Sequence, residues 1–115
     1  MTTGMTTGMI VTTTNVVEGR RVTDYLGVVH GSAVMGSNLF RDFFAGVRDI
    51  VGGRVASYET VLTDAKDAAL ADLISRAEGL RADAIIGVSF DHDSIGGDSK
   101  TILMVSATGT AVRLS

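Results

Sequence analysis

The chain has 115 residues, a net charge of −3 and 45% apolar residues, which fits one domain with an unusually apolar composition. It has no basic cluster, which argues against a nucleic-acid-binding surface, and no cysteine, which excludes disulfides, thiolate metal sites and cysteine nucleophiles. No apolar run reaches the length of about 18 residues that a membrane span needs. A mean hydropathy of +0.31 therefore predicts that another subunit covers part of the surface, as in a homo-oligomer.

The N-terminal residues 1–8 read MTTG twice and offer nothing to bury, so they predict a loose tail before a single domain over residues 9–115. An upstream start codon explains this repeat equally well, because Met9 begins the first structured segment. The stretch lacks the charged and apolar regions of a signal peptide, and we expect a cytoplasmic protein.

Strand signals come first along the chain. Residues 10–14 are rich in β-branched side chains and predict a short strand, and residues 15–20 predict a turn. Residues 22–34 predict a long strand that is bent, because Gly27 and Gly31 lie inside it.

Two helices are expected next. Residues 39–51 place their Phe, Leu, Val and Ile side chains at helical spacing, with Ser37 or Asn38 as the N-cap. Gly52-Gly53 ends this helix, and Ser57 is expected to cap a second helix that reaches Leu80.

Strands return in the last third of the chain. Residues 84–90 and 101–107 predict a hairpin, with residues 91–100 as its connection. Thr108-Gly109 predicts a kink before a final strand over residues 110–114. The order strand, strand, helix, helix, strand, strand, with a possible last strand, predicts a two-layer α+β domain whose antiparallel sheet carries both helices on one face.

Seven segments are distinctive in combination and in this order: IVTTTN (10–15), EGRRV (18–22), DYLGVVHG (24–31), MGSNLFRDFFAGVRDIVGGR (35–54), ASYE (56–59), ADAIIGV (82–88) and TGTAV (108–112). Together they resemble the YbjQ-like family, catalogued as putative heavy-metal-binding proteins of unknown function. The resemblance implies a dodecin-like subunit that assembles as a pentamer, or as a decamer of two rings, and its metal label names no ligands. Two positions depart from the family pattern: Ser32 replaces a common acidic residue, and Arg81 replaces a Gly at the end of the long helix.

The candidate metal ligands are Asp91, His92 and Asp93, with Asp98 nearby, and separately His30. If residues 91–93 continue a strand, Asp91 and Asp93 point one way and His92 the other, so one subunit alone cannot grip an ion with all three. The alternative is a solvated hairpin end, where Asp is common for turn chemistry. The alternative for His30 is a hydrogen-bonded structural histidine.

A second candidate site is Gly52-Gly53-Arg54, where a helix N-terminus and an arginine could hold an anion. Its alternative is a flexible link whose Arg54 pairs with an acid. No catalytic constellation connects the Ser, His and Asp residues, so we expect no enzyme and no firm cofactor, a divalent metal being implied only by the family label. The sequence therefore predicts a homo-oligomeric structural or small-ligand-binding protein, or alternatively a metal-binding protein with a site at or between subunits.

Overall fold

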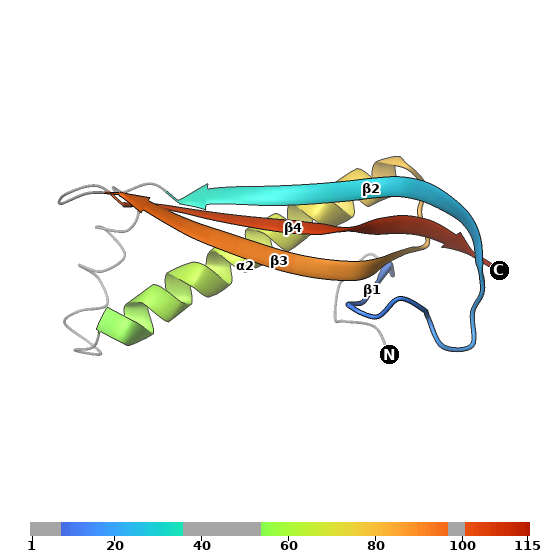
Figure 1. Ribbon diagram of the computed structural model, residues 1–115, viewed down its shortest axis with the longest axis horizontal. Coiled ribbons are helices and arrows are strands. Elements are labelled where there is room, and N and C mark those ends of the chain that lie inside the picture. Colours follow the sequence, from blue (N-terminus) through green and yellow to red (C-terminus); the bar gives the residue numbers. More distant parts are fainter. Residues whose placement is uncertain (1–7, 36–53, 97–100) are drawn as a thin grey trace.

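The computed structural model describes residues 8–35, 54–96 and 101–115. These residues form four strands and one helix, drawn in Figure 1 with α2 crossing one face of the sheet. The helix predicted over residues 39–51 lies outside the described residues. The elements are β1 (Ile10–Val11), β2 (Val22–Met35), α2 (Arg54–Gly79), β3 (Ala84–Gly96) and β4 (Thr101–Leu114).

The sheet has the order β1-β3-β4-β2. Strands β2, β4 and β3 are antiparallel neighbours, whereas β1 pairs in parallel with β3 through Ile10 and Val11. The α+β class is confirmed, but the expectation of a purely antiparallel sheet is wrong. The structure gives a mixed sheet because the chain crosses from β1 at one edge to β2 at the other.

Strand β2 is long and irregular, as its glycines predicted. Its register with β4 shifts between Val22 and Asp24 and again between Tyr25 and Gly27, where Gly27 adopts a φ of 129°. A residue with a side chain rarely adopts this backbone conformation, so glycine accommodates the bend.

Strand β4 runs without interruption through the predicted kink at Gly109. A β-carbon at Gly109 would lie 2.6 Å from Cγ2 of Ile85 and 3.1 Å from Cγ2 of Val88. The glycine is therefore explained by close packing against β3 and not by a break in the strand.

Strand β3 extends to Gly96, so residues 91–96 belong to the strand and not to a hairpin connection. Asp91, His92 and Asp93 pair with Ser106, Val105 and Met104 of β4. The long partner strand provides backbone hydrogen bonds that override the turn preference of the acidic residues.

Helix α2 begins at Arg54, so the predicted cap at Ser57 is wrong and this serine lies within the helix. The helix places an alanine-rich stripe on the sheet, including Ala65, Ala69 and Ala77, all fully buried. Small side chains allow the helix backbone to approach the strands closely. Part of the main core therefore lies between α2 and one face of the sheet.

Arg81, which stands where the family pattern has Gly, lies just after the C-terminal end of α2 and has a left-handed backbone. Its N–H donates to the Glu78 carbonyl at 2.9 Å, and the Ala82 N–H donates to the Ala77 carbonyl at 3.1 Å. This pair of bonds is a Schellman motif, which puts Arg81 at a position with φ 62° that favours glycine.

A second, smaller cluster covers one end of the opposite sheet face. Ala84, Ile86 and Val112 are buried there beneath the N-terminal residues Ile10 and Val17. No helix in the described ranges is long and apolar enough to cross a membrane.

Candidate functional site

The side chains of β2, β4 and β3 that point away from α2 form a surface that we call the outer face. Residues directly opposite on paired strands share a face, so the register defines its rows. One row joins Ser32, Ser106 and Asp91, and the next toward the end of β2 joins Val34, Met104 and Asp93. The outer face therefore collects polar and apolar side chains from three strands.

His30 lies on the outer face in the row of Thr108 and Ser89. The hydroxyls of Ser89 and Thr108 are hydrogen-bonded at 3.1 Å. This row adjoins that of Asp91, so His30 and Asp91 share a surface although they are two strands apart. Two strand spacings across the sheet and two residues along it set their backbones about 12 Å from one another.

His92 lies on the other face. It is paired with Val105, which is buried beside α2, whereas Asp91 and Asp93 lie on the outer face. The conditional prediction that His92 points away from its two acidic neighbours is therefore confirmed. Nearby on the α2 side, the Lys66 ammonium lies 5.3 Å from the centre of the Phe90 ring, in cation–π contact.

Within one chain, the candidate ligands that the structure describes, His30, Asp91, His92 and Asp93, do not come together as a metal centre. Among the described residues, no three His, Asp or Glu side chains come together closely enough to hold an ion. His30 stands with Asp91 and Asp93 on one face, and His92 is separated from them. Asp98 lies outside the described residues.

Of the candidate anion site Gly52-Gly53-Arg54, the structure describes only Arg54. Arg54 is the first residue of α2, as the helix-terminus hypothesis requires. Gly52 and Gly53 lie outside the described residues, so their part in an anion site stays a prediction.

Apolar side chains are exposed on the outer face. Val28 is 80% exposed and Val34 59% on β2, with Met104 at 42% and Ile102 at 39% on β4. An exposed side chain of this kind is ordinary when isolated, but Val34, Met104 and Ile102 lie in neighbouring rows and form an apolar cluster. Val28 lies on the same face three rows away, beyond the polar rows of His30 and Ser32.

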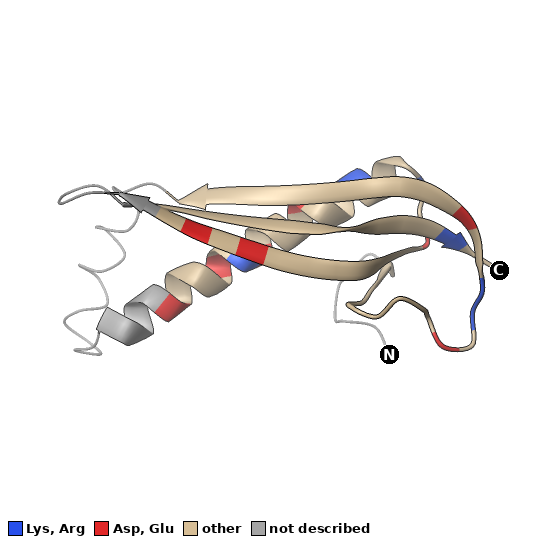
Figure 2. Cartoon of the chain, viewed as in Figure 1, with Lys and Arg blue, Asp and Glu red and all other residues tan. Residues whose placement is uncertain are grey.

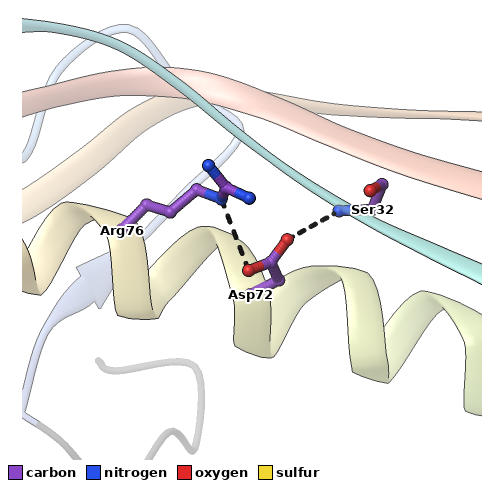
Figure 3. A network of polar contacts seen from close by, with 3 residues as sticks. All are labelled: Ser32, Asp72 and Arg76. Atoms are coloured by element: carbon purple, nitrogen blue, oxygen red, sulfur yellow. Dashed lines mark hydrogen bonds and ion pairs between the residues drawn. The ribbon is translucent and has the colours of Figure 1, made fainter.

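A polar contact between α2 and β2 was missed by the sequence analysis. The Asp72 carboxylate accepts a hydrogen bond from the Ser32 backbone N–H at 3.1 Å and another from Arg76 Nε at 3.3 Å (Figure 3). Asp72 and Arg76 are four residues apart on the helix, a spacing that favours this ion pair. The Ser32 contact joins residues 40 positions apart, and no local sequence signal indicates it.

The Ser32 N–H is the main cause of a lowered pKa at Asp72. Arg76 acts in the same direction through its hydrogen bond and its charge, whereas desolvation opposes both. The carboxylate is therefore held in its ionised form by the two groups that it joins.

Charged side chains are unevenly placed in the sheet (Figure 2). Asp91 and Asp93 put negative charge on β3, whereas β2 has no charged residue from Tyr25 to Met35. The outer face is therefore neutral on its β2 side and acidic on its β3 side.

The comparisons agree with this architecture. The model of the YbjQ family described as "Putative heavy-metal-binding" matches residues 9–115. A crystal structure from Pediococcus pentosaceus, of a protein with unknown function in the DUF74 family, is similar with a TM-score of 0.62 and 20% identity. The match covers 94% of this chain and 99% of that one, and at this identity it shows a shared fold. The family match over nearly the whole chain shows that this protein belongs to the YbjQ family described as putative heavy-metal-binding.

Proposed function

We propose that the protein is a homo-oligomeric structural or small-ligand-binding protein that assembles through the outer face and has no catalytic activity. The observation that carries this proposal is the exposure of Val28, Val34, Met104 and Ile102 on one surface. Covering such side chains with a second copy removes apolar area from water, which favours association by about 25 cal/mol per Å² before the costs of binding.

A pentameric ring, or a decamer of two rings, is the assembly implied by the resemblance to the YbjQ-like family. An odd number of subunits requires a head-to-tail contact, in which the outer face of one copy meets a different surface of the next. The unequal charge of the outer face is compatible with such a contact, because its acidic side need not face itself. A dodecin-like subunit and a cytoplasmic location belong to the same proposal.

Substitution of Val34 by Lys tests whether the outer face is the contact. A charge at this position would have to be desolvated on assembly, so the variant is expected to sediment as smaller species than the wild type. Val16→Lys is the matched control, because Val16 is 67% exposed but lies before β2 and outside the outer face. Unchanged mass in Val34→Lys, with the wild type oligomeric, would place the contact elsewhere.

Metal binding between subunits is the second candidate function. It is favoured by the presence of His30, Asp91 and Asp93 on one face, because imidazole and carboxylate are ligands for divalent transition metals. Their separation within a chain, about 12 Å for His30 and Asp91, means that a complete ligand set would combine two copies.

Calorimetric titration with Zn²⁺, Ni²⁺ and Cu²⁺ tests this candidate. Replacing His30 by Ala is expected to abolish the binding heat, whereas His92→Ala should retain it because His92 points to the other face. Loss of binding in His92→Ala alone, or no binding by the wild type, would contradict the proposed site.

An anion at Gly52, Gly53 and Arg54 is a further proposal for the ligand. Titration with inorganic phosphate, comparing the wild type with Arg54→Gln, should show weaker binding in the variant if Arg54 supplies the charge. Equal binding would remove Arg54 from the site.

A further inference from the structure

Strand β2 is the edge of the described sheet next to β4. Its sequence from Tyr25 to Met35 contains no charged residue and no proline. Edge strands of this kind present unpaired backbone groups to other chains and are usually protected by charge, by proline or by a cover. On the other side of the sheet, β3 carries two such protections. Asp91 and Asp93 put charge on the strand, and β1 with the segment after it covers part of its edge, where the Val88 N–H donates to the Thr12 carbonyl and the Thr12 N–H donates to the Ile85 carbonyl.

Helix α2 lies against this edge at the middle of β2. Gly31 is packed so closely on the backbone of Ala69 and Leu73 that a β-carbon would collide with both. One residue further, the Asp72 carboxylate holds the Ser32 N–H at 3.1 Å (Figure 3). Through Asp72, the helix thus accepts a hydrogen bond from a backbone N–H at the outward edge of β2.

We infer that Asp72 prevents the edge of β2 from pairing with a strand of a second copy of the chain. In an antiparallel sheet, alternate residues of an edge strand direct both backbone groups outward, so Ser32 shares this edge with His30 and Val34. An incoming strand that extends across them would have to displace the carboxylate from Ser32. The negative charge would also face the carbonyl oxygens of that strand, which repels them.

This role of Asp72 at the edge of β2 is independent of the proposed assembly. Contact through the outer face uses side chains, whereas edge pairing uses the backbone of β2 in the plane of the sheet. Its test therefore compares each variant with the mass of the wild-type protein, whatever that mass is.

Asp72→Ala removes the carboxylate and leaves the Ser32 N–H available to an incoming strand. Its weight-average mass in sedimentation equilibrium is expected to rise with concentration to at least about twice that of the wild type. Asp72→Asn keeps an oxygen that can accept the same hydrogen bond and should retain the wild-type mass. The double variant Asp72→Ala/Ser32→Pro lacks the carboxylate and also the donor, and it should return to the wild-type mass because proline blocks the edge.

Wild-type mass for Asp72→Ala across the concentration range would overturn the inference. So would association of the double variant as strong as that of Asp72→Ala, because pairing would not then use this edge. If the hydrogen bond had only a structural role, Asp72→Ala and the double variant would behave alike, because both lack it.

Amide hydrogen exchange on the wild type gives a readout that needs no folded alanine variant. The Ser32 amide is expected to exchange on the order of ten times more slowly than those of His30 and Val34 on the same edge. Equal rates at the three amides would overturn the claim that Asp72 occupies the donor.

Discussion

Gly31 of β2 lies directly against Ala69 of α2, and a β-carbon at Gly31 would collide with the Ala69 carbonyl oxygen. The obstacle is helix backbone, which cannot move aside as a flexible side chain can. Gly31→Ala is therefore expected to lower the free energy of unfolding by about 1–3 kcal/mol, the usual range for overpacking. Chemical denaturation at one fixed protein concentration measures the change.

Gly79→Ala is the matched control for this substitution. Gly79 ends α2, and a β-carbon there would meet nothing within 4 Å. Because alanine favours a helix more than glycine does, the control should be neutral or more stable by up to about 1 kcal/mol. A Gly31→Ala variant as stable as the wild type would show that the helix and strand separate readily at this contact.

Arg81→Gly is expected to stabilise the protein by about 1 kcal/mol, because Arg81 occupies a left-handed conformation that costs a residue with a β-carbon this much. The backbone contact from Arg113 Nη1 to the Arg81 carbonyl, at 2.9 Å, is available to glycine as well. Thermal and denaturant unfolding would measure the gain. Arg81→Ala separates the causes: it also removes the guanidinium but keeps the β-carbon, so an equal gain in both variants would contradict the backbone explanation.

In this protein, features set by residues close together in the chain could be predicted from the sequence, whereas contacts between distant residues could not. The strain at Arg81 was predictable because a helix end has local rules. The parallel pairing of β1 was not, because nothing in Ile10–Val11 specifies a partner more than 70 positions away, at Ala84 and Ile85. Asp91 and Asp93 have turn chemistry locally, yet pairing with β4 keeps them in a strand.

The candidate site shows the same division. Period-two alternation correctly separates His92 from Asp91 and Asp93 once a strand is assumed. The grouping of His30 with the two aspartates depends on β4 lying between β2 and β3, which only the register reveals. The contact of Asp72 with Ser32 likewise requires the helix to be placed on the sheet.

The stability contributed by the Asp72 charge is expected to depend on pH in the acidic range. The pKa of Asp72 is lowered by the Ser32 N–H and then by Arg76, so between the folded and unfolded pKa values the unfolded chain binds more protons. The contribution is therefore complete above the ordinary carboxyl pKa of about 3.9 and is lost as the pH falls through the lower folded value. The difference in unfolding free energy between wild type and Asp72→Asn should shrink correspondingly on acidification.

Asp91→Asn controls for the loss of one negative charge, since Asp91 is an exposed position on β3. Urea unfolding from pH 2 to pH 7 would compare the three proteins. A wild-type advantage over Asp72→Asn that stays constant, or grows, as the pH falls would contradict the stabilising role assigned to the ionised carboxylate.

Sedimentation velocity of the full-length protein at micromolar concentration tests the central claim, that another copy covers the apolar outer face. The proposal predicts a single species of about five or about ten times the 12.0 kDa mass of one chain. A species of 12.0 kDa across the concentration range would contradict it, because Val28, Val34 and Met104 would then remain in water.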